Sequence, residues 1–384
     1  MQFNIYQVAQ LNALQRLNKN VGYNRTAYVC PFCDDKKGRF TLSVSAGRGN
    51  VYKCFHCDEA GGQVTLHRKL NGFNTNSDAI KDIEKRLKES GELTEIKPLK
   101  VDENTEKNVD RKPKEYLHKV YLDTLKLCVL DAKHEADLLR RGFTKQAIKK
   151  WWFRSTPKHT LDVCRSLINL GYDLEGVPGF YINKDGFWDM NVNKGYFCPV
   201  WDFQNNLILG FQIRLDNPKE KRKYVWFSSV NRKGGCSSHS PATFLKGDSS
   251  LVIITEGILK ATLTYEMLGG KFSVIGVAGA GTLSGLEPYQ NYLEDKTILE
   301  AYDMDKRPIK DKPESVKKAN NITKYVIKLK NALPKSCVFT SLYWNYDDCY
   351  WKGEIKGIDD YLVSLNANER FLYSSVLEQK GGLK

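Results

Sequence analysis

Four cysteines near the N-terminus form the most specific chemical pattern in the sequence. Cys30 and Cys33 make one Cys-x2-Cys pair, Cys54 and Cys57 make a second, and twenty residues separate the two pairs. Zinc binds four thiolates in a tetrahedron, and two such pairs at this spacing are typical of a zinc site. We therefore predict one structural zinc ion on these four cysteines. A redox dithiol, or four unrelated cysteines, is the less favoured alternative.

The segment between the two pairs predicts a hairpin. Residues 40–45 alternate like a strand, residues 47–50 are typical of a turn, and residues 51–54 return to the second pair. The N-terminal part is therefore expected to be a zinc ribbon, in which His56 could compete as a ligand. Basic and aromatic residues interleave on this ribbon: Arg39, Arg48, Lys53, Phe40, Tyr52 and Phe55. They could bind single-stranded nucleic acid, or the aromatic rings could form the ribbon's small core.

Carboxylates follow apolar runs in the last third of the chain. Glu256 ends the run 251–256, and Asp303 and Asp305 end the run 296–305. The second run is predicted to be a strand to its end, so the two aspartates are expected to point to the same side, because alternate strand residues share a face. Strands alternating with helical segments predict an α/β domain with a mainly parallel sheet. Ligands of such sheets bind outside the carboxyl ends of the strands.

Clustered carboxylates repel one another unless a cation lies between them. Oxygen ligands favour Mg²⁺ or Mn²⁺, and such ions assist phosphoryl and nucleotidyl transfer. Asp359, in the segment KGIDDYL, is a further candidate ligand. The alternative is that the Asp-x-Asp marks a solvated turn. A haloacid-type phosphatase also uses Asp-x-Asp, but Arg307 stands where that class has Thr or Val.

Composition and charge divide the 384 residues into four parts. Residues 1–91 carry a net charge of +6, residues 115–247 a net charge of +8, and residues 248–384 are neutral. Residues 92–114 contain six acids, six bases and no aromatic residue, which predicts a linker. The excess of positive charge indicates a polyanionic partner, with a merely solubilising surface as the alternative.

Two function classes are disfavoured by the sequence. No apolar run is long enough to span a bilayer, and the N-terminus lacks a secretory pattern, so we expect no membrane partner. Ten cysteines without a secretory signal indicate a reducing compartment. We therefore expect a cytoplasmic protein, in a bacterium or in the host of a phage.

The order of these parts resembles a bacterial-type (DnaG-like) DNA primase. The segment YKCFHCDEAGGQV at 52–64 resembles the second half of the primase zinc domain, and residues 198–229 resemble the basic subdomain. TEGILKA, GVAGAGTLSG, AYDMDK and KGIDDYL then follow in the order of the TOPRIM domain, which primases share with topoisomerases and some nucleases. The form is similar to compact primases of phages and mobile elements.

The resemblance implies a multidomain α+β and α/β protein. The implied order is a zinc ribbon (1–91), a linker (92–114), a basic α+β subdomain (115–247) and a TOPRIM α/β domain (248–384). It implies short RNA primers made from ribonucleoside triphosphates on single-stranded DNA, together with a separate helicase partner. The implied magnesium ligands are Glu256, Asp303, Asp305 and Asp359. Arg214, Lys223 and Lys260 would bind triphosphate and template phosphates.

The chain also departs from the family pattern. Cys33 stands where a histidine ligand is usual, Gly357 stands where an acid is frequent, and residues 306–320 form a lysine-rich insertion. A C-terminal helicase-binding domain and a P-loop are missing from the sequence. Trp151 and Trp152 could stack on bases or lie in the core. Two alternative functions stay open: a TOPRIM topoisomerase or nuclease, and a non-catalytic DNA-binding replication or defence factor.

Overall fold

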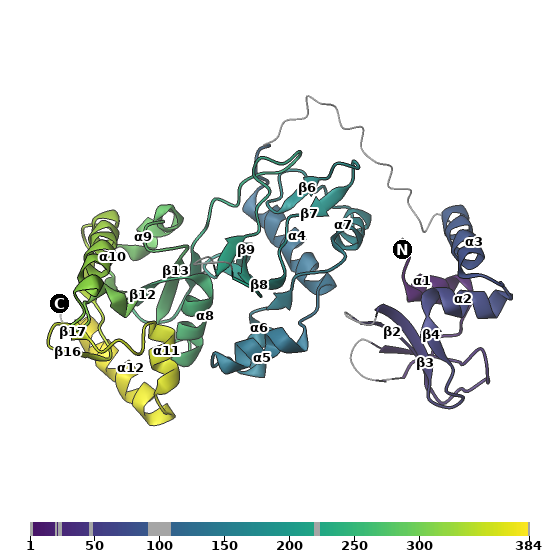
Figure 1. The fold of residues 1–384 in the computed structure, drawn as a ribbon, viewed down its shortest axis with the longest axis horizontal. Helices are drawn as coiled ribbons and strands as arrows, with labels where there is room; N and C mark the ends of the chain where they lie inside the picture. The colour runs from purple at the N-terminus through teal and green to yellow at the C-terminus, as the bar shows by residue number, and fades with distance from the viewer. Residues whose placement is uncertain are drawn as a thin grey trace. The chain divides into compact units, whose positions relative to one another are not determined.

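A computed structural model describes residues 3–19, 21, 25–45, 49–90, 109–218 and 223–382. The chain divides into two compact units (Figure 1). The first comprises residues 1–101, 159–172 and 184–187, and the second comprises residues 102–158, 173–183 and 188–384. No helix among the described residues is long and apolar enough to cross a membrane.

The first unit places a four-stranded antiparallel sheet against three helices. Its strands pair in chain order: β1 (Arg25–Tyr28), β2 (Phe40–Ser45), β3 (Gly49–Cys54) and β4 (Ala60–Gly62). Its helices are α1 (Ile5–Leu11), α2 (Gln63–Asn71) and α3 (Asn76–Glu89), and α7 (Thr160–Asn169) is grouped with this unit. The predicted hairpin is confirmed, because Phe40 pairs with Cys54 and Ser43 with Val51. Arg48 lies outside the described residues.

The second unit is built on one mixed sheet, which contains nine strands in the part of the chain described. Its antiparallel part consists of β5 (Arg154–Ser155), β8 (Gly195–Asp202), β9 (Leu207–Leu215) and β10 (Tyr224–Trp226). Helices α4 (Lys114–Leu127), α5 (Ala132–Arg140) and α6 (Lys145–Lys150) and the hairpin of β6 (Phe180–Ile182) and β7 (Trp188–Met190) complete this part. Strand β11 (Thr243–Leu245) joins it to the rest of the sheet.

The remaining strands are parallel to one another, as the sequence predicts. They lie in the order β13 (Ser273–Val277), β12 (Leu251–Glu256), β14 (Thr297–Glu300) and β15 (Val338–Ser341). The connections are α8 (Ile258–Met267), the short helices η1 (Ser284–Tyr289) and α9 (Gln290–Leu293), and α10 (Pro313–Ala332). The chain continues through η2 (Met304–Lys306), β16 (Tyr346–Asp347), β17 (Tyr350–Trp351), α11 (Ile358–Ser364) and α12 (Ala367–Gly382). Because the chain leaves β12 toward one neighbour and returns on its other side, the crevice at its carboxyl end is a natural ligand site.

Residues 92–108 of the predicted linker lie outside the described part of the chain. Its last residues, by contrast, are anchored on the second unit. The Lys112 backbone N–H donates to the Gly176 carbonyl at 2.9 Å, and the Arg111 guanidinium donates to the Leu209 carbonyl at 2.8 Å. These bonds fix residues 111 and 112 to the second unit ahead of α4, although the sequence assigned them to the linker. The predicted boundary at residue 247 falls between β11 and β12 of the continuous sheet.

Candidate functional site

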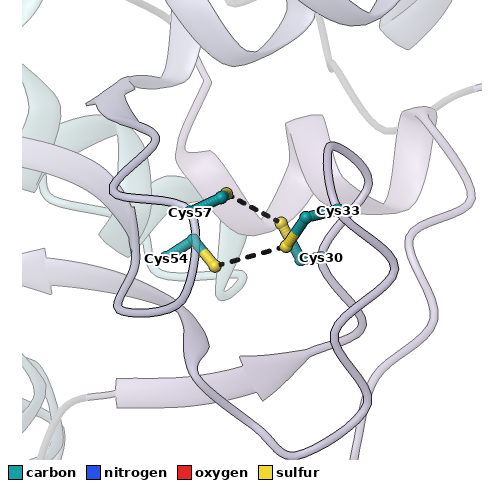
Figure 2. A group of neighbouring side chains, drawn as sticks. All are labelled: Cys30, Cys33, Cys54 and Cys57. Carbon is teal, nitrogen blue, oxygen red and sulfur yellow. Dashed lines mark hydrogen bonds between the residues drawn. The ribbon is translucent and has the colours of Figure 1, made fainter.

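The four predicted zinc ligands meet at one point in the first unit (Figure 2). Their sulfur atoms all lie within 4.8 Å of one another. The Sγ atoms of Cys30 and Cys57 are 3.9 Å apart, and those of Cys33 and Cys54 are 3.8 Å apart. Four thiolates at about 2.3 Å from a zinc ion lie about 3.8 Å from one another. The cluster therefore has the dimensions of a tetrahedral zinc site. His56 is close by, with Nδ1 at 3.4 Å from the Cys33 sulfur.

The ribbon's aromatic residues divide between the two roles that the sequence left open. Phe40 and Tyr52 are buried in the core of this unit. Phe55, by contrast, is 54% exposed, and its ring has the Lys53 ammonium at 5.3 Å and the Arg25 guanidinium at 6.0 Å. The core interpretation is confirmed for two rings, while the third is an exposed aromatic surface between two cations.

Glu256 and Lys260 are positioned by the turn between β12 and α8. Five residues of β12 are buried before Glu256, so this side chain is the first to emerge at the carboxyl edge of the sheet. Gly257 then reverses the chain at φ = 95°, a conformation that favours glycine. Its N–H donates to the Val277 carbonyl at 2.7 Å, which fixes the turn to the next strand. The first turn of α8 thereby places Lys260 beside the strand end.

The loop that carries Asp303 and Asp305 differs from the sequence prediction. Strand β14 ends at Glu300, and the two aspartates follow in a loop and a short 3-10 helix, so strand alternation does not orient them. Instead the loop folds back on the strand. The Lys306 ammonium donates to both carboxylate oxygens of Glu300, at 2.8 and 2.9 Å, and both side chains are buried. This buried ion pair fixes the loop that the apolar pattern had suggested was strand.

Lysines neutralise the two aspartates. The Asp303 carboxylate is paired with Lys260 through one oxygen and with Lys356 through the other, at 2.8 Å. Asp305 Oδ2 is paired with Lys318 at 2.7 Å and with Lys356 at 3.0 Å. Lys356 therefore bridges both carboxylates. Asp305 Oδ1 is buried and has no hydrogen-bond partner.

Asp359 approaches the same group from the first turn of α11, which packs on α8. Its Oδ1 atom is buried without a hydrogen-bond partner. Burial raises the pKa of Asp359 to about 6, although the nearby Lys260 ammonium opposes that shift. Gly357 makes this position possible, because a side chain there would collide with the Asp359 carboxylate. The glycine that departs from the family pattern therefore accommodates the neighbouring acid.

Burial and mutual repulsion set the charges of the cluster. Burial and the adjacent Asp303 carboxylate raise the pKa of Glu256. Burial also opposes ionisation of Asp303, but the Lys260 and Lys356 ammonium groups outweigh it and hold the Asp303 pKa well below its usual range. The same carboxylates raise the pKa of Lys260 despite its burial. The structure thus brings Glu256, Asp303 and Asp359 together around Lys260, and Lys356 joins Asp305 to this group.

Two other predicted site residues lie on or beside the paired strands β9 and β10. Arg214 pairs in register with Tyr224 and has its guanidinium 5.1 Å from that ring. Burial above all, and more weakly Cys198 and Asp359, raises the pKa of Tyr224 to about 12. Lys223 is exposed beside β10, and in the described part of the chain no ion pair joins it to the carboxylates.

The tryptophan pair does not form one stacking surface. Trp151 is 1% exposed, and its indole N–H donates to Glu266 at 2.7 Å, so it belongs to the core. Trp152 is half-buried, with the Arg154 guanidinium 5.0 Å from its ring. The core alternative is therefore correct for the first tryptophan.

Sequence reasoning missed the lysines that complete the acidic cluster. Lys356 stands three residues before Asp359 in a segment already singled out, so its position was a usable signal. Lys318 lies in the lysine-rich insertion, where no pattern distinguishes it from its neighbours. Glu300, the partner of Lys306, lies inside the run 296–305 that the sequence predicted to be strand throughout.

Comparison with known sequences gives one relative to report, and no protein-family model matches the chain. Over 226 residues the chain is 24% identical to a DNA primase of Clostridium acetobutylicum. The similarity covers 56% of this chain and 35% of the relative. The matched part is therefore about a third of the length of that primase.

Three solved primase structures align with this chain at low identity. The zinc-binding and RNA polymerase domains of the Aquifex aeolicus primase align over 98% of this chain and 83% of theirs, with a TM-score of 0.47 and 14% identity. The RNA polymerase domain of Mycobacterium tuberculosis primase aligns over 68% of this chain and 86% of its own, with a TM-score of 0.47 and 13% identity. The primase fragment of the bacteriophage T7 primase-helicase protein has a TM-score of 0.31 at 14% identity, over 83% of this chain and 90% of the fragment.

Proposed function

We propose that this protein is a DNA primase that synthesises short RNA primers on a single-stranded DNA template. The observation that carries the proposal is the convergence of Glu256, Asp303, Asp305 and Asp359 at the carboxyl edge of parallel strands. The sequence similarity to a DNA primase supports the same reading. The reaction is nucleotidyl transfer, carried out in a cytoplasm with ribonucleoside triphosphates and a separate helicase.

The oxygen chemistry of the acidic cluster suits a divalent cation such as Mg²⁺ or Mn²⁺, although among the described residues only the cysteine cluster has ligand atoms that all lie within 4.8 Å of one another. Asp305 and Asp359 each direct a buried carboxylate oxygen that lacks a hydrogen-bond partner, and an unpaired buried oxygen is costly unless a cation binds it. Glu256 and Asp303 supply further oxygen ligands. When bound, the ion would activate a ribonucleotide 3′-hydroxyl and stabilise charge at the α-phosphate of the incoming nucleotide.

The protein's own cations have separate tasks in this proposal. Lys260 is buried and paired with Asp303, so it keeps that carboxylate ionised and in place. Arg214 lies beside Tyr224 on strand β9, which three strands of the sheet separate from β12, and would bind phosphate oxygens in bidentate fashion. The exposed Lys223 would contact the template backbone.

The cysteine cluster has a structural task and an indirect functional one. Zinc on Cys30, Cys33, Cys54 and Cys57 would hold the ribbon together. Phe55 and its flanking cations would then present a stacking surface for template bases. This division of labour places start-site selection on the first unit and chemistry on the second.

The test is synthesis on single-stranded DNA with Mg²⁺ and labelled ribonucleotides. The wild-type protein should make short oligoribonucleotides. Asp303→Ala and Asp305→Ala should each abolish synthesis while leaving DNA affinity within about twofold. Asp347→Asn, an exposed acid on the β16–β17 hairpin, is the control and should stay active.

Three outcomes distinguish the competing functions. Strand scission or relaxation without synthesis would replace the proposal with a TOPRIM topoisomerase or nuclease. DNA binding without synthesis, together with unchanged activity of Asp303→Ala in the cell, would support a non-catalytic factor. Oligoribonucleotides that vanish in both aspartate variants would support a primase.

A further inference from the structure

Lys356 occupies an unusual place in the acidic cluster. Its ammonium lies 2.8 Å from Asp303 Oδ2 and 3.0 Å from Asp305 Oδ2, so one cation serves both aspartates. Its backbone is tied to the same loop, because the Met304 N–H, between the two aspartates, donates to the Lys356 carbonyl at 2.9 Å. The position of this ammonium is thus set by main-chain and side-chain bonds together.

The three lysines of the cluster differ in how easily their ammonium groups can move away from the carboxylates. The Lys260 side chain is 16% exposed and packed in α8, so it stays with Asp303 when other groups arrive. The side chains of Lys356 and Lys318 are 43% and 62% exposed. Moving these two ammonium groups from the carboxylates into solvent costs little free energy, because charged groups near water keep much of their hydration. One counter-ion is therefore fixed and two are displaceable.

Both oxygens of the Asp303 carboxylate are held by ammonium groups, one by Lys260 and the other by Lys356, so a divalent ion can bind Asp303 only by displacing one of them. Carboxylate oxygens bind Mg²⁺ or Mn²⁺ directly, at distances shorter than any hydrogen bond. An ammonium that already holds one oxygen from each aspartate blocks that approach and repels a second cation. The cluster therefore contains its own competitor for the metal.

Resting on the function proposed above, we infer that Lys356 is an internal counter-ion that holds Asp303 and Asp305 in place and that a divalent ion must displace. Without it, the two carboxylates would repel each other in the metal-free protein. Once displaced, the flexible side chain is beside the site and can pair with a phosphate of the nucleotide. Metal in complex with a nucleotide is thereby favoured over metal alone.

The test is Mn²⁺ binding to the full zinc-loaded chain without nucleotide. Binding is measured from the decrease in the electron paramagnetic resonance signal of free Mn²⁺. Lys356→Met should bind Mn²⁺ about tenfold more tightly than the wild type. Lys352→Met, which removes an exposed lysine shortly before it, should leave the affinity unchanged. Lys356→Met affinity equal to or weaker than wild type would overturn the inference.

Two further measurements distinguish displacement of the Lys356 ammonium from a general effect of the substitution on the fold. Thermal unfolding without added metal should show a lower Tm for Lys356→Met than for wild type, and Mn²⁺ should raise the Tm of the variant by more. Lys356→Arg keeps a cation, so its Mn²⁺ affinity should stay at or below that of the wild type, and tighter binding would count against displacement. Asp303→Asn should lose Mn²⁺ binding, which tests the metal site of the proposed function. This result does not depend on Lys356, so the two proposals can fail separately.

Discussion

The two candidate metal sites of this protein differ in what offsets the repulsion between their ligands before a metal binds. In the first unit, four cysteine sulfurs lie at distances that suit a metal ion, and they come from a single hairpin and its flanking turns. In the second unit, four carboxylates come from three separated segments, and lysines lie between them. Thiols can stay neutral until metal binds, whereas carboxylates with low pKa values need a cation at once. The cysteine cluster therefore needs no counter-ion before its metal binds, whereas the acidic cluster has lysine ammonium groups as internal counter-ions.

The largest effect that this comparison predicts follows from removing a sulfur ligand. Cys54→Ser should lose the zinc, about one ion per chain, and unfold the ribbon, because structural zinc contributes on the order of 10 kcal/mol to such small units. Metal analysis and circular dichroism check both outcomes. Cys349→Ser, at an exposed cysteine of the second unit, is the matched control. A folded, zinc-loaded Cys54→Ser protein would break the comparison.

The second prediction concerns the buried ion pair between Glu300 and Lys306, which fixes the loop that carries Asp303 and Asp305. Lys306→Met leaves Glu300 buried without a partner and should lower the free energy of unfolding by about 3–5 kcal/mol. Burial already lowers the pKa of Lys306 although Glu300 opposes that shift, which indicates how costly the site is for an isolated charge. Urea denaturation measures the effect.

A double variant sharpens this prediction. Glu300→Gln combined with Lys306→Met removes both charges and should recover part of the lost stability, because no uncompensated charge remains. Equal destabilisation in the single and double variants would mean that packing, not charge, fixes the loop.

The third prediction is a gain of stability at the functional site. Because burial raises the pKa of Asp359 from 3.8 to about 6, ionisation of this carboxyl destabilises the folded metal-free protein increasingly between these two pH values and fully above the second. Asp359→Asn should therefore increase the free energy of unfolding at pH 8 by up to about 3 kcal/mol, since one pKa unit corresponds to about 1.4 kcal/mol. At pH 5 the gain should fall to about half, because the folded carboxyl is then mostly protonated.

Urea denaturation at the two pH values, without added magnesium, checks this sign. Asp347→Asn, at an exposed acid, should change stability by less than about 0.5 kcal/mol at either pH. Lower stability of Asp359→Asn at pH 8 would show that the carboxylate is stabilised rather than strained in its place.

The smallest predicted effect concerns the surface of the ribbon. Phe55→Ala should weaken binding of single-stranded DNA by about 1–3 kcal/mol, the range for loss of one stacked base, while zinc content stays unchanged. Fluorescence anisotropy with a labelled oligonucleotide measures it. Tyr346→Ala, which removes an exposed ring from the second unit, should have a smaller effect. Equal losses in the two variants would leave no special role for the ribbon.

How much the sequence predicts differs between the two sites for a physical reason. The zinc ligands are local: Cys30, Cys33, Cys54 and Cys57 are joined by one hairpin, so spacing alone predicts their meeting. Glu256 was predictable because a buried strand must release its first polar side chain at the edge of the sheet. The prediction that Asp303 and Asp305 lie on a strand was wrong, since the Glu300–Lys306 pair is invisible to a pattern of apolar residues.

The lysine contacts are non-local and could not be read from periodicity. Lys260 and Asp303 are 43 residues apart, and Lys356 reaches Asp303 from a segment beyond another strand and helix. Lys318 and Lys356 belong to a helix and a loop whose own sequences are ordinary for an exposed surface, whereas Lys260 lies in the mostly buried helix α8. Only the folded sheet shows which of the many lysines of this basic chain face the carboxylates.

The most direct measurement of the central claim is the anomalous scattering of Mn²⁺ in crystals of the protein grown with Mn²⁺ and a non-hydrolysable ribonucleoside triphosphate analogue. The account predicts a manganese peak bound by carboxylate oxygens of the group formed by Glu256, Asp303, Asp305 and Asp359, with the Lys356 ammonium moved away from the aspartates. Manganese bound elsewhere, with Lys356 still bridging the two aspartates, would contradict it.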